Sequence, residues 1–292
     1  MKIAISTTVK NLDPSFNTWV QYHLALVDQL FIFCDNHGEL QLPFLPKGSN
    51  IQYFPGSQTQ VYDSPIDNNM VRQDENIRQT VAACLDMGID WLIHIDLDEL
   101  MCATRLELEV LFGNPAVGQV LFTNHEAIPV WESDNVFEDC RYFKVNGQHA
   151  GWDNDPWFFL AYVNGKGAGR IHPELCSVGP HQFGNIQGET LKYLPKPFVL
   201  HYPNSTFELW KRKYENLGVF GDFWFSDPNK PNTITFYMAS RDVYQHCMQT
   251  GDFSKAESFF SRLIPLPEMI EQLVAQGVLM KLEPLRKLKP HG

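Results

Sequence analysis

Three acidic side chains follow a short, largely apolar stretch of the chain. Asp96, Asp98 and Glu99 come directly after Trp91-Leu92-Ile93-His94-Ile95. That stretch predicts a buried strand over residues 90–95, and carboxylates straight after such a strand suit a core poorly. On extended chain Asp96 and Asp98 face the same side and repel each other unless a cation lies between them. Since Mg²⁺ and Mn²⁺ prefer oxygen ligands, the sequence predicts either a divalent-metal site or a turn with solvated acids.

The elements that position these acids alternate along the first hundred residues. Apolar runs predict strands at 2–8, 29–34, 50–54 and 90–95, and helical spacing predicts helices at 16–27 and 70–88. This order indicates an α/β fold with a mostly parallel, doubly wound sheet and helices on both faces. Ligands of such sheets bind at the carboxyl ends of the strands, where the acidic residues fall.

After residue 115 the pattern is more mixed. Further strands are expected at 118–123, 157–163 and 196–202, with loops over 131–158 and 221–233. An amphipathic helix is expected at 205–217. Helices at 236–249, 252–263 and 266–276 predict a C-terminal helical segment.

Composition narrows the class of protein. A formal net charge of -11 argues against nucleic acid as a partner, and a nucleotide would need local cations or a metal. The six cysteines show no zinc or redox spacing, which is typical of reduced thiols in a cytoplasmic protein. We expect no signal peptide and no transmembrane segment. The basic segment Lys281 to Gly292 predicts a solvated tail, with weak peripheral contact to a membrane surface as the alternative.

Several spaced motifs share their order with a known group of enzymes. They are Thr7-Thr8-Val9-Lys10-Asn11; Trp19, Tyr22 and His23; Asp35-Asn36; Gln73 and Asn76; residues 91–100; Gly165-Lys166 with Gly179-Pro180-His181; and Leu200-His201-Tyr202 with Ser205 and Phe207. This order resembles the GT-A fold glycosyltransferases, in particular the family-2-like and family-92-like group with a D-x-D-E motif. The resemblance spans about residues 1–217.

The resemblance implies a nucleotide-diphosphate sugar donor, UDP or GDP with UDP favoured, and Mn²⁺ or Mg²⁺ as cofactor. Asp98 would be the principal metal ligand, and Asp96 would lie near the ribose and the metal. Residues around the base, ribose and phosphates would be Thr7, Thr8, Lys10, Asp35, Arg72 and Gln73. Residues 1–115 would be the donor-binding half and 116–220 the acceptor-binding half of one GT-A domain, followed by a helical extension at 221–292.

Two further roles stay open between candidates. Enzymes of this fold commonly complete the metal shell with a downstream histidine, here His181 or His201. A general base near the acceptor hydroxyl would be Asp153 or Asp155, in a loop rich in tryptophan, or Glu126 after an expected strand.

The resulting hypothesis is a cytoplasmic, metal-dependent hexosyltransferase acting on a glycan or lipid-linked sugar, with inversion of configuration favoured over retention. A nucleotidyltransferase or phosphohydrolase that uses the same carboxylates is one alternative. A non-catalytic module that binds nucleotide or glycan is the other.

Overall fold

The computed structural model describes residues 1–13, 15–147, 158–192 and 194–288. The chain forms two compact units that interleave in sequence. Unit 1 comprises Met1–Val61, Asn68–Asn124 and Asn164–Val199, and unit 2 comprises Tyr62–Asp67, His125–Val163 and Leu200–Gly292. The expected division into a donor-binding half, an acceptor-binding half and a helical extension, with bounds at residues 115 and 220, stays a prediction. In the described part of the chain, no helix combines the length and hydropathy that a membrane crossing requires.

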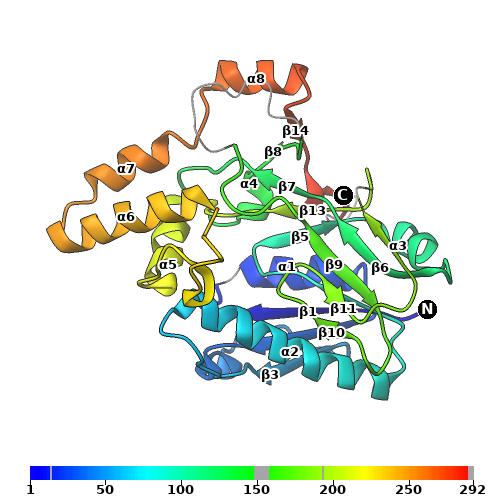
Figure 1. Cartoon of the computed structure of the whole chain (residues 1–292). Coiled ribbons are helices and arrows are strands. Elements are labelled where there is room, and N and C mark those ends of the chain that lie inside the picture. The colour runs from blue at the N-terminus through cyan, green and yellow to red at the C-terminus, as the bar shows by residue number, and fades with distance from the viewer. Residues whose placement is uncertain (14, 148–157, 193, 289–292) are drawn as a thin grey trace. The chain divides into compact units, whose positions relative to one another are not determined.

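Unit 1 is built on a seven-stranded sheet of order β12-β6-β9-β4-β1-β2-β3. Figure 1 labels β1, β3, β6 and β9 of this sheet. Its strands are β1 (Ile3–Val9), β2 (Gln29–Cys34), β3 (Ile51–Pro55), β4 (Trp91–His94), β6 (Val117–Phe122), β9 (Lys166–Arg170) and β12 (Glu189–Lys192). β9 runs antiparallel to both of its neighbours, β4 and β6, and the other pairings in this sheet are parallel. The predicted α/β class with a mostly parallel sheet is confirmed.

The strand order reverses beside β1. The chain proceeds from β1 outward to β2 and β3, and then returns to place β4 on the other side of β1. In open α/β sheets, ligands bind outside the carboxyl ends of the strands at such a reversal. A ligand site is therefore expected beside the residues that follow β1, β2 and β4.

Helices cover both faces of this sheet. α2 (Pro65–Met87) packs Ile77, Val81 and Cys84 into a core shared with Ala4 and Leu92 of the sheet. α1 (Ser15–Leu24) lies on the opposite face (Figure 1). α3 (Arg105–Phe112) begins at a capping box formed by Thr104 and Glu107, and its Phe112 ring stacks on Trp91 at 4.2 Å between ring centroids.

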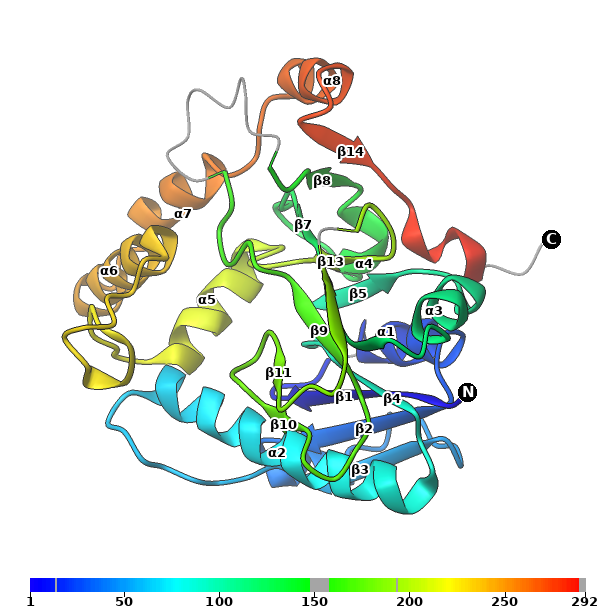
Figure 2. The ribbon, with the colours of Figure 1, turned by 45° about the vertical axis from the view of Figure 1, so that its right-hand side comes forward.

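A two-stranded hairpin packs over β9. Its strands are β10 (Cys176–Ser177) and β11 (Phe183–Gly184), and Figure 2 shows them beside β9. Phe183 and Leu175 occupy the space over Gly169, where an added Cβ would lie 3.0 to 3.1 Å from their side chains. The glycines of β9 therefore let this segment lie close to the sheet.

Unit 2 contains a smaller sheet and the C-terminal helices. Its sheet has the neighbours β14 (Leu279–Lys281), β8 (Tyr142–Lys144), β7 (Asn124–Ala127) and β13 (Phe198–His201). The helices are α4 (Val136–Asp139), α5 (Phe207–Leu217), α6 (Thr235–Thr250), α7 (Ser254–Ser261) and α8 (Pro267–Ala275). Trp210 of α5, Phe236 of α6 and Phe259 of α7 share one apolar core, so the predicted C-terminal helical segment is confirmed.

Three expected elements differ from the structure. The loop expected over 131–158 contains α4 and β8. The helix expected at 70–88 begins five residues earlier at Pro65, because proline is well suited to the first turn of a helix. The strand expected at 157–163 is wrong for the described residues 158–163, which form none. There the backbone N–H groups of Leu160 and Ala161 donate to the carboxylate of Glu126, so they are not available to a strand ladder.

Candidate functional site

The acidic residues form a tight turn between β4 and β5 (Glu99–Cys102). The backbone N–H of Asp96 donates to Glu99 Oε2 at 2.7 Å, and the N–H of Glu99 donates back to the carbonyl of Asp96 at 3.2 Å. Glu99 is fully buried, and its side chain thus closes the turn. Asp96 and Asp98 are half-buried, at the predicted end of the strand.

A fully buried lysine lies against this turn. Lys166, the first residue of β9, donates from Nζ to Asp96 Oδ2 at 2.5 Å and to the carbonyl of Pro180 at 3.2 Å. The same Nζ lies 3.6 Å from Glu99 Oε2. An ammonium group of the chain itself therefore lies between the side chains of Asp96 and Glu99. The sequence predicted a cation between a different pair, Asp96 and Asp98, and the divalent metal expected there stays a prediction.

The protonation of this cluster follows from burial and charge. Burial alone would raise the pKa of Asp96, but the charges of Lys166 and His94 hold it well below its usual range. Burial alone would lower the pKa of Lys166, and the charges of Asp96 and Glu99 raise it above its usual value. The pKa of Glu99 is raised well above its usual range because burial outweighs the charge of Lys166. The opposite charges of Asp96 and Lys166 thus stabilise each other, while burial disfavours the ionised form of Glu99.

His181 belongs to the same cluster. Its Nδ1 donates to the carbonyl of Gly165 at 2.8 Å, which leaves the lone pair of the neutral ring on Nε2. Burial and the charge of Lys166 lower its pKa to about 3, so the ring is neutral at physiological pH. This fixed tautomer is the state in which an imidazole binds a metal.

The side chains of Asp96, Asp98 and His181 are of the types that bind a hard divalent cation, but they do not form a complete metal site. Asp96 and Asp98 supply carboxylate oxygens and His181 supplies an imidazole nitrogen. Yet across the ranges that the structure describes, no three His, Cys, Asp or Glu side chains are grouped closely enough to hold an ion. Asp96 already accepts from Lys166 and, through Oδ1, from Gln73 at 3.0 Å.

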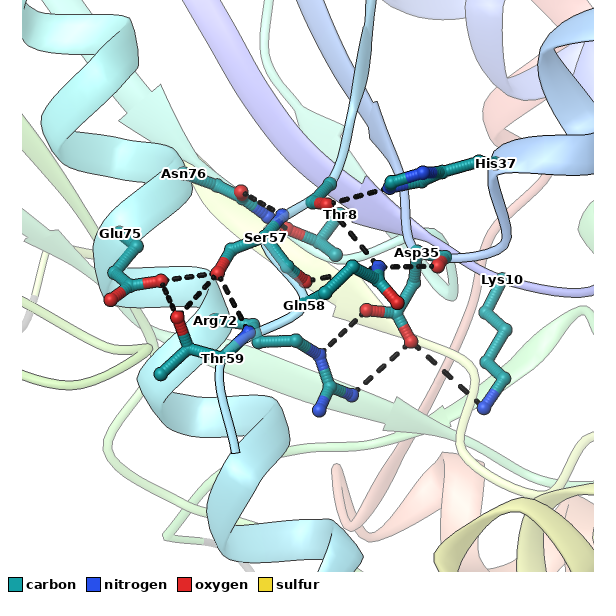
Figure 3. Close-up of polar contacts among 11 residues, drawn as sticks. Thr8, Lys10, Asp35, His37, Ser57, Gln58, Thr59, Arg72, Glu75 and Asn76 are labelled. Atoms are coloured by element: carbon teal, nitrogen blue, oxygen red, sulfur yellow. Dashed lines mark hydrogen bonds and ion pairs between the residues drawn. The ribbon is translucent and has the colours of Figure 1, made fainter. Parts of the chain in front are cut away.

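The end of β2 carries a second charged cluster. Arg72 of α2 donates from Nε to Asp35 Oδ1 at 2.7 Å and from Nη2 to Oδ2 at 3.2 Å. Lys10, after β1, lies 3.9 Å from the same carboxylate. Figure 3 shows Arg72 and Lys10 approaching Asp35 from different sides. Three of the predicted nucleotide-binding residues are therefore brought together.

The predicted pair Thr7 and Thr8 divides between the faces of β1. Thr8 Oγ1 accepts from Asn76 Nδ2 of α2 at 2.9 Å, so its side chain lies on the α2 face (Figure 3). Thr7 is buried on the other face, because successive side chains alternate along a strand. Of the two, Thr8 is the one beside the charged cluster of Asp35.

Sequence reasoning missed a loop that follows β3. Ser57 and Thr59 donate their hydroxyls to Glu75 Oε2, and the Ser57 N–H donates to Asn76 Oδ1 at 3.0 Å (Figure 3). These hydroxyl bonds, that of Ser57 first, lower the pKa of Glu75. A signal was present in α2, where five polar residues stand in a row at 72–76 and interrupt the apolar spacing.

In unit 2, Glu126 and His201 lie close together. Glu126 is fully buried, accepts the N–H groups of Leu160 at 2.6 Å and Ala161 at 3.0 Å, and lies 3.8 Å from His201 Nδ1. Burial raises the pKa of Glu126, against the nearby charge of Lys144.

The His201 ring stacks on Tyr162 with 4.7 Å between ring centroids. His201 therefore shares its unit with the candidate base Glu126, and His181 shares its unit with Asp96 and Asp98. The other candidate bases, Asp153 and Asp155, lie outside the described residues.

Comparison with known proteins gives partial matches. The chain is 33% identical over 157 residues to one glycosyltransferase-like protein of Arabidopsis thaliana and 31% identical over 157 residues to another, in each case over 47% of this chain. It spans about a third of the length of these curated relatives, 34% and 30% respectively. No family model matches the chain.

Among solved structures, 4-diphosphocytidyl-2C-methyl-D-erythritol synthase from Anaerococcus prevotii matches at 12% identity and a TM-score of 0.33, over 58% of this chain and 70% of that one. The bifunctional IspDF from Campylobacter jejuni matches at 6% identity and a TM-score of 0.29, over 46% of this chain and 35% of that one. Likenesses this low carry no conclusion about the activity of this chain.

Proposed function

We propose that this chain transfers a sugar from a nucleoside diphosphate donor, with UDP favoured, to a hydroxyl group of a glycan. One observation carries the proposal. Two adjacent residues of α2, Arg72 and Gln73, contact Asp35 after β2 and Asp96 after β4. These two strands flank β1, so two neighbouring strand spacings, about 10 Å, separate their ends. Both clusters lie where the strand order reverses.

The chemistry of the two clusters suits the two ends of such a donor. Asp35, with Lys10 and Thr8 beside it, offers acceptors and donors for a base and a ribose. Arg72 uses Nε and Nη2 for Asp35, and its guanidinium can still donate from Nη1 to a phosphate oxygen. The similarity to glycosyltransferase-like proteins supports a sugar as the group attached to the diphosphate.

A divalent cation is part of the proposal, with Asp98 as its carboxylate ligand and His181 as its nitrogen ligand. When bound, Mn²⁺ or Mg²⁺ would neutralise charge on the departing diphosphate. The residues of the chain hold the donor: Gln73 and Lys166 fix the Asp96 carboxylate from two sides, which prevents it from turning away from a ligand.

The acceptor side of the proposal needs a general base. The sugar hydroxyl must lose its proton as its oxygen bonds to the donor carbon and the nucleoside diphosphate leaves. Glu126, Asp153 and Asp155 remain the candidate bases. The two backbone N–H groups that Glu126 accepts suit a fixed carboxylate, and its burial raises its pKa toward that of a working base.

A cytoplasmic location is also proposed. All six cysteines are free thiols, in keeping with a reducing compartment. The acceptor class, a glycan or a lipid-linked sugar, follows from the proposed transfer and is tested with it.

Thermal shift with UDP, GDP and CDP, each with and without Mn²⁺, tests the donor assignment. We expect one nucleotide to raise the melting temperature in the presence of Mn²⁺, and we expect Asp98→Ala to abolish that rise. Asp86→Ala, an exposed aspartate on α2, is the matched control and should behave as wild type. Nucleotide binding that neither needs Mn²⁺ nor changes in Asp98→Ala would contradict the role given to Asp98.

Donor hydrolysis distinguishes transfer from attack on phosphate. A transferase without its acceptor releases free sugar and nucleoside diphosphate slowly from the UDP-sugar. Release of UMP and sugar phosphate would instead identify a phosphohydrolase and would refute the proposed reaction. Tight nucleotide binding with no turnover of any donor would favour a binding module.

A further inference from the structure

Lys166 reaches the acidic turn because of the direction of β9. The antiparallel register pairs Trp91 with Arg170 and Ile93 with Ala168. Continued by two residues, this register places Lys166 opposite Ile95, one residue before Asp96. The start of β9 therefore lies at the same edge of the sheet as the carboxyl end of β4.

The backbone around Lys166 is closely held on both sides. A Cβ on Gly165 would lie 1.8 Å from the carbonyl oxygen of Phe122, and a Cβ on Gly167 would lie 3.0 Å from the carbonyl oxygen of His181. Gly165 also has a φ of +71°, which favours glycine. The lysine is thus presented from a segment that has little room to move.

The ammonium group of Lys166 satisfies one carboxylate of the turn. Its Nζ contacts Asp96 Oδ2 and Pro180 O, and its side chain is fully buried. Withdrawal of a buried ammonium from its carboxylate partner is strongly unfavourable, since each group would be left without its counter-charge. Any second cation that approaches Asp96 must therefore overcome both the existing pair and repulsion from Lys166.

We infer that Lys166 is the resident cation of the acidic turn, and that it keeps divalent metal ions from binding there unless a nucleoside diphosphate binds with them. This inference rests on the proposed function. Asp98 then contributes the carboxylate at which the metal enters. The phosphate oxygens contribute negative charge in place of that of Asp96, which Lys166 already balances. Lys166 acts here as a positioning residue, through Asp96 and the charge of the site.

Binding of Mn²⁺, followed by the loss of its free-ion signal in electron paramagnetic resonance, tests the inference without reference to activity. For the wild-type chain we expect binding of Mn²⁺ alone to be at least about tenfold weaker than binding in the presence of saturating UDP. Wild-type protein that binds Mn²⁺ equally well with and without UDP would overturn the inference, whatever the behaviour of any variant.

Lys166→Met removes the charge and keeps an unbranched side chain. We expect this variant to bind Mn²⁺ without nucleotide at least about tenfold more tightly than wild type, because Asp96 has lost its counter-ion. Lys166→Arg keeps the charge and should retain the weak binding of the wild type. Lys192→Met, at an exposed lysine of β12 in the same sheet, is the matched control and should also bind as wild type.

Circular dichroism establishes that Lys166→Met is folded, and a folded variant with unchanged Mn²⁺ affinity would refute the inference. If the variant does not fold, the comparison of wild type with and without UDP still decides. The proposed function fails separately: in that case no nucleoside diphosphate binds under any condition. If UDP binds and Lys166→Met gains no metal affinity, only the role of Lys166 is wrong.

Discussion

Arg72 donates to both carboxylate oxygens of Asp35, and this pair ties the eighth residue of α2 to the end of β2. The two side chains are 13% and 8% exposed, so the pair is largely shielded from solvent. A bidentate pair of this kind fixes the orientation of both partners. The proposed nucleoside end of the site is therefore ordered before any ligand arrives.

Substitution of Arg72 tests whether its pair with Asp35 prepares the site for the nucleotide. We expect Arg72→Gln to weaken UDP binding about tenfold or more, or ~1.4 kcal/mol, because Asp35 loses its fixed partner and the phosphates lose a donor. Arg72→Lys should recover only part of the affinity, since an ammonium group cannot donate as a fork. Isothermal titration calorimetry measures the change. Arg78→Gln, an exposed arginine on the same helix, is the control, and equal affinities for Arg72→Gln and wild type would exclude a binding role.

Gly165 is expected to be intolerant of any side chain. Gly165→Ala should lower the free energy of unfolding by about 3 kcal/mol or more, because a left-handed φ and a collision with the Phe122 carbonyl both oppose it. Gly88→Ala is a matched control, since Gly88 has a φ of +62° and nothing within 4 Å of an added Cβ. It should lose only about 1 kcal/mol. Urea denaturation measures both, and equal losses would show that the Phe122 contact does not matter.

His23 makes stability depend on pH. It is fully buried, donates from Nδ1 to the Trp19 carbonyl at 2.9 Å and accepts the Met101 N–H at Nε2. Burial lowers its pKa to about 3 from the usual 6.5. As pH falls below 6.5, the unfolded chain takes up a proton that the folded chain refuses until about pH 3. Stability is therefore lost on acidification through this window, by up to ~1.4 kcal/mol per pH unit, and is unaffected above it.

His23→Gln separates this effect from other acid-sensitive groups. The variant should be less stable than wild type at pH 7, since it loses a well-fitted ring. Between pH 6 and pH 4.5 its free energy of unfolding should nevertheless fall less steeply than that of wild type. The slopes should differ by up to ~1.4 kcal/mol per pH unit, which is the effect of one proton. Urea denaturation at each pH gives the slopes, with His246→Gln at an exposed site as the control. Parallel slopes for His23→Gln and wild type would show that His23 does not titrate on unfolding.

Glu126 is expected to contribute to stability as well as to any catalysis. In Glu126→Gln the amide N–H₂ faces the N–H groups of Leu160 or Ala161, so a buried donor is left without an acceptor. We expect a loss of about 2 kcal/mol or more in the free energy of unfolding. Glu132→Gln, at an exposed position of the same unit, should change stability little. A neutral effect of Glu126→Gln would mean that the two N–H groups find other partners.

Part of this site was predictable from local pattern. The apolar run before Asp96 ends abruptly, and the hydrophobic effect places such a run inside and its polar end at an edge. The same reasoning located Asp35 after β2. The alternation of strands and helices then predicted the mostly parallel sheet, because the connections of parallel strands require crossovers.

Lys166 could not be assigned in this way. Its partner Asp96 is 70 residues away, and the contact depends on the insertion of β9 between β4 and β6 in the reverse direction. Residues 165–169 read Gly-Lys-Gly-Ala-Gly, which has little intrinsic preference for a strand. Those glycines are needed because the segment that carries His181 packs directly over them. Packing between segments that lie far apart in the sequence leaves no periodic pattern of apolar residues from which this strand could be predicted.

The position of β9 also constrains how this sheet can form. β4 and β6 do not pair with each other, so each offers an open edge until β9 joins them. β9 follows β6 by more than forty residues, and a chain still being synthesised exposes both edges throughout that interval. Open edges invite pairing with other chains, and distant pairings close slowly. The strand that supplies the lysine of the acidic turn is thus the strand that joins β4 to β6. The cluster around Asp96 is therefore completed only when these two facing edges are paired.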